Sequence, residues 1–122
     1  MSVRFYQYPK CSTCRKAAKW LKRYGVEIES IDISQQPPGA EELRKMLGYM
    51  DGNIRKLFNT SGRQYRELKL KDKLVDMSDD DAMRLLASDG MLVKRPFLLT
   101  ENGGTVGFRE DIWHKLLLHG SS

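Results

Sequence analysis

The sequence has few of the residues that would build a covalent or metal-bound framework. Of its 122 residues, only two are cysteine and two are histidine. Two cysteines cannot form the set of disulfides that staples small secreted domains. A structural zinc site would need two further soft ligands, and His114 and His119 lie at the far end of the chain without a matching spacing. We therefore expect neither a disulfide framework nor a bound metal.

Long hydrophobic runs are also missing. No apolar stretch approaches the roughly 20 residues that cross a bilayer. Residues 1–10, "MSVRFYQYPK", lack the apolar segment and small-residue cleavage site of a secretory signal. We therefore expect a cytoplasmic protein with no membrane partner. The length and the 40% hydrophobic content suit one globular domain spanning residues 1–122.

Charge of one sign is not concentrated anywhere in the chain. The net charge of +5 comes from 21 basic and 16 acidic residues, and the basic residues are densest at 10–23, 63–73 and 94–95. A nucleic-acid-binding domain usually gathers its charge on one face, together with aromatic residues or a recognisable motif. We therefore expect no direct nucleic-acid partner, although local clusters would suit a small anionic substrate.

Hydrophobic periodicity predicts alternating strands and helices. A strand at 2–8 precedes a helix that begins near Ser12 or Thr13 and stops at Gly25, and a second strand follows at 26–33. The later elements are a helix at 40–49, a short helix at 53–58, a turn at 59–65, a capped helix from Ser78 to Gly90, strands at 97–100 and 105–108 joined by "ENGG", and a last helix at 109–118.

This order predicts an α/β fold of the thioredoxin-like class. Two strands joined by a helix form a parallel βαβ unit, to which the later hairpin adds an antiparallel pair. The result is a mixed four-stranded sheet with a C-terminal helix. Residues from about 34 to 94 then form a helical insertion within the single domain.

Both cysteines lie in "CSTC", where the first strand turns into the first helix. Cys11 would sit at the helix N-terminus, where free N–H groups and the helix dipole favour a thiolate. Lys10, Arg15 and Lys16 add positive charge nearby, and Arg15 is a candidate contact for an anionic substrate. Cys14, one turn further on, would resolve an adduct on Cys11 as a disulfide.

Two other interpretations of the cysteine pair remain open. Cysteine is among the most buried residue types, so Cys14 could belong to the core while Cys11 caps the helix without reacting. Metal binding is the less favoured of the two. A C-x-x-C pair at a strand-to-helix turn of a βαβ unit favours redox chemistry over both.

Two further motifs concern arginine. In "KRP", Pro96 stands just before a strand, where thioredoxin-like folds hold a cis proline facing the active cysteine, although a trans proline would also fit. Arg95 could bind an oxyanion with its planar fork of donors. Arg109, in "GFRE", could reach the same pocket. Either arginine could instead be an ordinary surface charge.

Taken together, "YPKCSTCRKA", "KRP" and "GFRE" resemble the arsenate reductase family, which includes the Spx-type regulators. The resemblance covers nearly the whole chain and implies a thioredoxin-like fold with a helical insertion. In the glutaredoxin-coupled reductases a cysteine matching Cys11 attacks arsenate among three arginines. Arg95 and Arg109 match two of them, and Asn59 stands at the third position. The resemblance also implies glutathione with glutaredoxin, or thioredoxin, as the reductant.

The same resemblance implies a second possible function. Those reductases usually lack a cysteine at the position of Cys14, whereas Spx-type regulators use a C-x-x-C pair as a redox switch and bind the C-terminal domain of the RNA polymerase α chain. Gly52 falls near a glycine of that polymerase contact, although it also suits an ordinary turn. We favour a thiol-dependent reductase in which Cys11 attacks, Arg95 and Arg109 hold the anion and Cys14 closes the disulfide. The redox-sensing regulator is the alternative.

Overall fold

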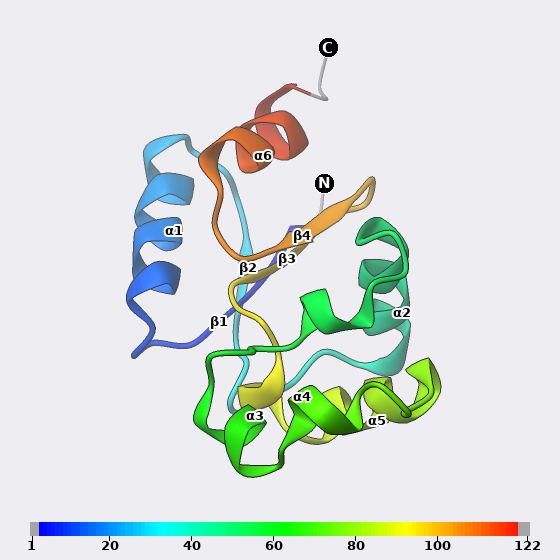
Figure 1. Cartoon of the computed structure of the whole chain (residues 1–122). Helices are drawn as coiled ribbons and strands as arrows, with labels where there is room; N and C mark the ends of the chain where they lie inside the picture. The colour runs from blue at the N-terminus through cyan, green and yellow to red at the C-terminus, as the bar shows by residue number, and fades with distance from the viewer. Residues whose placement is uncertain (1–2, 120–122) are drawn as a thin grey trace.

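In the computed structural model, which describes residues 3–119, a four-stranded mixed sheet forms the centre of the molecule (Figure 1). Its strands are β1 (Arg4–Gln7), β2 (Glu29–Asp32), β3 (Phe97–Leu99) and β4 (Gly104–Val106), in the order β2-β1-β3-β4. β1 pairs in parallel with β2 and antiparallel with β3, and β3 pairs antiparallel with β4. The predicted βαβ unit and hairpin are both confirmed.

Helices cover both faces of the sheet. They are α1 (Ser12–Arg23), α2 (Ala40–Tyr49), α3 (Arg63–Glu67), α4 (Leu70–Lys73), α5 (Asp79–Ser88) and α6 (Glu110–His114), with 3-10 turns η1 (Ile54–Leu57) and η2 (Gly90–Leu92) and the π-helical η3 (Lys115–His119). α1 and α6 lie on one side, and α2 to α5 lie on the other (Figure 1). The thioredoxin-like α/β fold with its helical insertion is thus present.

The alternation of side chains along the strands divides the core between these two layers. Phe5 and Leu98 pack against Trp20 and Trp113, which belong to α1 and α6. The neighbouring Tyr6 lies on the opposite face, in the cluster formed with the insertion. Because both faces are covered, apolar residues occupy successive strand positions instead of alternating with polar ones.

The second strand is shorter than predicted. The hydrophobic pattern predicted a strand at 26–33, but pairing with β1 begins only at Glu29. Val26 and Ile28 pack against the core beside α1 without joining the ladder. Burial therefore explains their apolar character better than pairing does. At the first strand, Ser2 of the predicted 2–8 lies outside the described residues.

The turn predicted at 59–65 is partly wrong. Gly62 ends the turn and caps α3, which begins at Arg63. Tyr65 and Leu70, on α3 and α4, are 6% and 1% exposed and pack into the insertion core. Tertiary packing thus stabilises helices of only four or five residues that local propensity did not indicate.

A polar cluster ties the insertion to the central strand. The Glu42 carboxylate on α2 accepts hydrogen bonds from the Tyr6 hydroxyl and from Arg4 Nη1, each at 2.6 Å. Gly39 N–H also donates to it, at 3.2 Å. Burial tends to raise the pKa of Glu42, but the hydrogen bonds from Tyr6 and Arg4 outweigh it and lower that pKa below its ordinary value of 4.5.

This cluster makes stability depend on pH. Because the folded-state pKa of Glu42 is depressed, its contribution is full above about pH 4.5 and is lost as the pH falls through the folded value. We expect Glu42→Gln to lower the free energy of unfolding by about 1–3 kcal/mol at pH 7 and to flatten its decline in acid. Urea unfolding between pH 7 and 3 measures both effects. Glu41→Gln, on the exposed side of the same turn, is the control, and an equal loss there would contradict the assignment.

Candidate functional site

The N-terminus of α1 holds the cysteine pair in a fixed arrangement. Cys11 is the N-cap residue, and its Sγ accepts a hydrogen bond from the Cys14 backbone N–H at 3.4 Å. Its own N–H donates to the Tyr8 carbonyl at 3.0 Å, which closes the loop after β1. A negative charge on Cys11 Sγ therefore faces the free N–H groups of the first helical turn.

The surroundings of Cys11 favour its thiolate. Burial of this half-buried side chain would raise its pKa, but hydrogen bonds from the Cys14 side chain and backbone counteract it. The positive charge of Arg95 and the Thr13 backbone act in the same direction, so the pKa of Cys11 falls below the ordinary value of 9.0. A lowered thiol pKa is characteristic of nucleophilic cysteines.

Cys14 has the opposite character. Its side chain is 2% exposed, and both cysteines are free thiols in this structure. Burial, together with the hydrogen bond and the charge of Cys11, raises the pKa of Cys14 to about 12, against a smaller lowering by the Tyr8 backbone. The two thiols thus differ in accessibility and in acidity, which gives them different chemical roles.

Arg95 is the positive charge associated with this pair. The Arg95–Pro96 peptide bond is cis, which is one of the two forms that the sequence left open. The guanidinium carbon lies 5.1 Å from the centroid of the Tyr8 ring, and Nη1 donates to the Met91 carbonyl at 3.3 Å. Arg95 Nε is buried, and it has no hydrogen-bond partner among the described residues. A buried donor without a partner is costly. The planar guanidinium that carries it is also a group that binds anions.

The insertion helps to position this arginine. The segment before Pro96 runs antiparallel to the exit from η1, with Lys94 N–H donating to the Leu57 carbonyl at 2.8 Å. Asn59 N–H donates to the Leu92 carbonyl at 2.7 Å on the same pair of segments. The backbone that carries Arg95 is therefore fixed by the insertion as well as by β3.

The other three candidate residues each have contacts or surroundings of their own. Arg109 is exposed at the N-cap of α6 and lines a groove together with Lys94, the neighbour of Arg95. Asn59, at the position of the third family arginine, accepts a hydrogen bond from Ser61 Oγ at 3.4 Å within its own turn. Arg15 is exposed, and its Nη1 donates to the Pro9 carbonyl at 3.1 Å, bracing the loop.

Tyr8 is a site residue that motif reasoning did not single out as a contact. Its ring lies under the Arg95 guanidinium, and its carbonyl anchors Cys11. The sequence signal was present, since Tyr8 is the third residue before the cysteine. Its pairing with Arg95 depends on a contact between segments 87 residues apart (95 minus 8), which no local pattern reveals.

Removing the charge of Arg95 should slow the reaction of Cys11. We expect Arg95→Gln to reduce the iodoacetamide alkylation rate of Cys11 at pH 7 by about three- to tenfold, because the thiolate loses a nearby cation. Timed alkylation followed by mass spectrometry measures this rate. Arg15→Gln removes an equal charge bound to the Pro9 carbonyl and should change the rate by less than about twofold. Equal effects of the two substitutions would contradict a specific role for Arg95.

Neither a metal site nor a membrane span occurs in the described part of the chain. Within residues 3–119, no group of three or more His, Cys, Asp or Glu side chains is arranged to hold a metal ion. Over the same range, no helix is both long enough and apolar enough to cross a bilayer.

The fold and the thiol pair together define a thioredoxin-like domain with a C-x-x-C motif at the start of its first helix and a cis proline before β3. The model of the ArsC family matches residues 6–116. The chain therefore belongs to the ArsC family, and the resemblance deduced from its motifs is confirmed.

Individual relatives fall into different branches of that family. The uncharacterized protein YusI of Bacillus subtilis (strain 168) is 55% identical over 111 residues, which cover 91% of this chain and 94% of YusI. A structure described as a possible arsenate reductase from Streptococcus mutans UA159 is 47% identical, with a TM-score of 0.83, and the match covers 90% and 96% of the two chains. The global transcriptional regulator Spx of Streptococcus mutans is 27% identical over 109 residues, covering 89% of this chain and 78% of Spx.

Proposed function

We propose that this protein is a thiol-dependent reductase of the cytoplasm that uses Cys11 as nucleophile and Cys14 as resolving thiol. The observation that carries the proposal is the placement of Cys11 at the N-cap of α1, with a lowered pKa and the buried, unpartnered Nε of Arg95 nearby. Attack by Cys11 on a substrate requires the thiolate as nucleophile. It also requires a nearby cation that stabilises the negative charge of the bound substrate or of the leaving group.

With a disulfide substrate, the reaction proceeds in two exchanges. The Cys11 thiolate attacks one substrate sulfur, the substrate S–S bond breaks, and a thiolate leaves. The leaving thiolate takes the proton of Cys14, which then attacks Cys11 Sγ and releases the second substrate sulfur as a thiolate. Two electrons pass to the substrate, and a Cys11–Cys14 disulfide forms. Two glutathione molecules through glutaredoxin, or one thioredoxin dithiol, would reduce it again.

With arsenate, the same pair would act on an oxyanion. Cys11 would displace water from arsenate to form a sulfur–arsenic bond, with Arg95 balancing the charge. Attack of Cys14 on Cys11 Sγ would then leave the electron pair on arsenic, reducing As(V) to As(III) and closing the disulfide. The name of the Streptococcus mutans relative supports this substrate. Asn59, where the family has its third arginine, supports disulfides over arsenate, because a neutral amide binds an oxyanion less strongly than a guanidinium.

A redox-sensing regulator is the second candidate. The likeness to Spx extends over 89% of this chain. An exposed turn also follows α2, where Asp51 and Gly52 both have a positive φ, of 57° and 76°. This turn would present Gly52 to a partner such as the C-terminal domain of the RNA polymerase α chain. Oxidation of Cys11 and Cys14 would then act as a signal, without turnover.

Turnover distinguishes the two candidates. Reduced protein is mixed with glutathione, glutaredoxin, glutathione reductase and NADPH, and then with arsenate or a small disulfide other than glutathione disulfide, and the rate of the same mixture without this protein is subtracted. Sustained NADPH consumption that requires Cys11 supports the reductase. A Cys11–Cys14 disulfide that forms once without turnover, together with capture of the C-terminal domain of the polymerase α chain, supports the regulator. Absence of both turnover and disulfide would overturn the redox proposal.

A further inference from the structure

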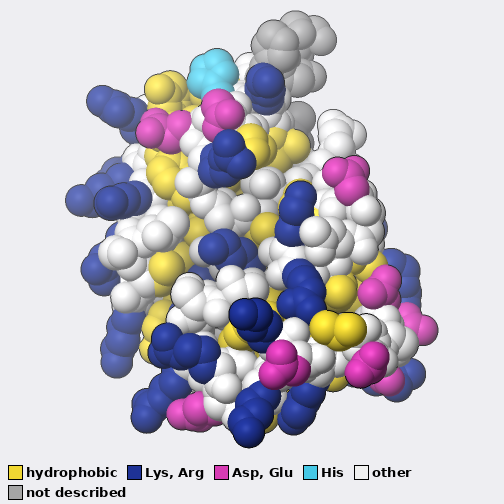
Figure 2. Space-filling view, in the orientation of Figure 1, with side chains coloured by type: hydrophobic (Ala, Val, Ile, Leu, Met, Phe, Trp, Pro, Cys, Tyr) yellow, Lys and Arg dark blue, Asp and Glu magenta, His cyan; other side chains and the backbone are white. Residues whose placement is uncertain are grey.

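The exposed side of α1 carries only positive charge. Its buried side consists of Cys14, Ala17, Trp20 and Leu21. Five exposed cations, here called the basic stripe, lie opposite: Arg15, Lys16, Lys19, Lys22 and Arg23. At 3.6 residues per turn these positions fall within about 120° of the helix surface, along about 12 Å of its axis. In Figure 2, Lys and Arg side chains project in a row along the left edge of the molecule, where Figure 1 places α1.

The basic stripe accounts for the whole net charge of the chain. The chain has 21 basic and 16 acidic residues, so that removing the five cations of the stripe leaves 16 of each sign. The even distribution of charge predicted from the sequence is therefore wrong for α1. Cations that are separated by apolar residues in the sequence meet on one side of the helix.

This arrangement is unfavourable for α1 itself. Like charges three or four residues apart, as at Arg15 and Lys19 or at Lys19 and Arg23, repel each other along a helix. The first turn, where acidic residues would be stabilising, has none. Within residues 3–119, no cation of the basic stripe makes an ion pair. An acidic surface from outside the chain would relieve this repulsion, so the charge favours an acidic partner.

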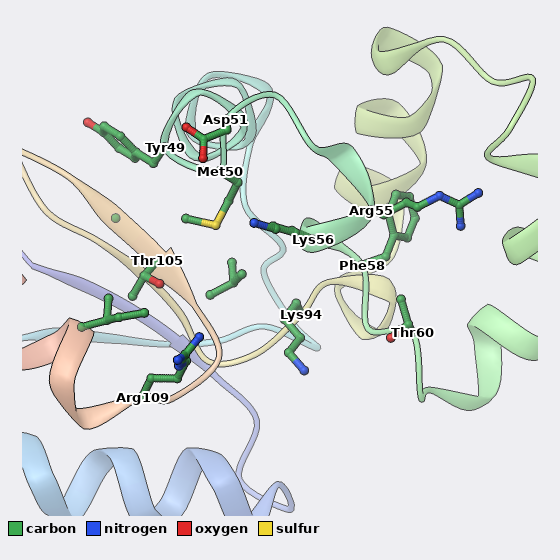
Figure 3. A pocket seen from close by; sticks show the side chains of 13 residues that line it. Tyr49, Met50, Asp51, Arg55, Lys56, Phe58, Thr60, Lys94, Thr105 and Arg109 are labelled. Atoms are coloured by element: carbon green, nitrogen blue, oxygen red, sulfur yellow. The ribbon is translucent and has the colours of Figure 1, made fainter.

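A groove runs beside the basic stripe, between α1 and the segment that leads into α6. Its volume is about 400 Å³. Its lining residues are Lys16, Lys19, Trp20, Arg23, Phe108 and Glu110. It shares no residue with the larger groove that Lys94 and Arg109 line (Figure 3). The basic stripe therefore borders apolar surface of its own.

The surroundings of the basic stripe favour a protein over other acidic partners. Trp20 is only 5% exposed and so offers no ring face on which a nucleic-acid base could stack. The apolar side of α1 packs into the core through Ala17, Trp20 and Leu21, so it cannot enter a lipid surface as an amphipathic membrane helix does. A protein segment with Asp or Glu side chains needs only the exposed cations and the groove beside them.

The basic stripe also leads directly to Cys11. Arg15 N–H donates to the Cys11 carbonyl at 3.1 Å, so Arg15 lies one helical turn beyond the thiol residue. Arg15 Nη1 donates to the Pro9 carbonyl in the loop that carries Cys11. A protein that lies along the stripe therefore has one end beside the Cys11 thiol.

We propose that the basic stripe docks an acidic surface of a partner protein and so presents a disulfide of that protein to Cys11. The inference rests on the proposed reductase function and names its substrate class, a protein disulfide flanked by Asp or Glu. Cys11 Sγ forms a new S–S bond with one partner sulfur, the partner's S–S bond breaks, and its other sulfur leaves as a thiolate. The stripe raises the rate of encounter without touching the reacting atoms.

Reaction rates with matched peptides test the proposal. Each peptide carries one cysteine as a 2-pyridyl disulfide beside a row of either Glu or Gln residues. Attack by Cys11 releases pyridine-2-thione, whose absorbance gives the rate. At low salt, we expect the Glu peptide to react about tenfold faster than the Gln peptide. At about 0.5 M salt the two rates should be nearly equal, because the charges are screened.

Two variants with equal loss of charge locate the effect. The stripe variant combines Lys19→Gln, Lys22→Gln and Arg23→Gln, and the control variant, in α3 and α4, combines Arg66→Gln, Lys71→Gln and Lys73→Gln. The stripe variant should lose most of the tenfold preference for the Glu peptide and keep the rate with the Gln peptide. The control variant should keep the preference. An equal loss in both variants, or equal rates of the two peptides with the unaltered protein, would overturn the proposal.

Binding without chemistry separates docking from thiol reactivity. Isotope-labelled Cys11→Ser protein is titrated with the Glu peptide in which serine replaces cysteine, and amide resonances are followed by NMR. We expect shifts at Lys16, Lys19 and Arg23 that disappear as salt is added. If these shifts occur while the unaltered protein releases no pyridine-2-thione, the docking surface stands and the reductase proposal fails. Absence of the shifts would overturn the docking surface, as would tighter binding of single-stranded DNA or of phosphatidylglycerol vesicles.

Discussion

Cys11→Ser should abolish nearly all alkylation of the native, reduced protein at pH 7, whereas Cys14→Ser should retain a fast-reacting thiol. We expect the rates of the two variants to differ by at least about 100-fold. A thiol with a pKa of about 12, as at Cys14, is ionised in only about one molecule in 100,000 at pH 7. A thiol at the ordinary value of 9.0 is about 1% thiolate, and the pKa of Cys11 lies below that value.

Burial adds to this difference in acidity. Cys14 is 2% exposed, so a reagent reaches it only when the start of α1 opens. In Cys11→Ser the charge and hydrogen bond of Cys11 no longer raise the pKa of Cys14, but burial, the largest cause, remains. The remaining thiol should therefore stay unreactive.

The pH dependence of alkylation provides the check. In Cys14→Ser, the rate should rise with pH as the Cys11 thiolate forms, because the backbone N–H of residue 14 and Arg95 still favour that thiolate and the serine hydroxyl can still donate to it. Similar rates in the two single variants would remove the basis for separate nucleophilic and resolving roles. Near-ultraviolet circular dichroism of both variants excludes unfolding as the cause.

Gly90→Ala should destabilise the protein by at least about 3 kcal/mol. Gly90 begins η2, and a Cβ built there would lie 1.8 Å from the Ile33 carbonyl oxygen and 2.8 Å from its carbonyl carbon. Both atoms are backbone, so no rotamer change relieves the clash. Ile33, directly after β2, is itself 0% exposed, so moving it would disturb the core.

Gly48→Ala is the matched control for this prediction. Gly48 lies within α2, and a Cβ there meets nothing within 4 Å. Alanine is the better helix former, so this change should stabilise the protein by about 0.5–1 kcal/mol. Urea unfolding of both variants, with unchanged m-values, measures the difference. If Gly90→Ala cost less than about 1 kcal/mol, η2 would be free to move away from Ile33.

The elements with clear local signals were predictable from the sequence. The helix at 40–49 and the Ser78 cap of α5 appear as expected, because apolar spacing and capping residues agreed at those positions. The short helices α3 and α4 did not follow, since packing of Tyr65 and Leu70 decides their structure. The last predicted helix, 109–118, is an α-helix only to His114 and continues as a π-helix.

The thiol site was predictable to the extent that it follows from motif position. Placing Cys11 at a helix N-terminus required only the strand–turn–helix pattern around "CSTC". The contact between Arg95 and Tyr8 required the full fold, because it joins segments distant in sequence. Sequence position suggested one pocket for both arginines, and this stays a prediction.

The pairing of β1 on both sides has a consequence for local motion. Because β1 is hydrogen-bonded to β2 and to β3, we expect its amides to exchange with solvent only when the whole domain opens. The loop bearing Cys11 leaves directly from this strand, so its attachment point should stay protected in both redox states. When the Cys11–Cys14 disulfide forms, amide hydrogen-exchange rates should therefore change in the first turn of α1 and stay nearly unchanged in the sheet.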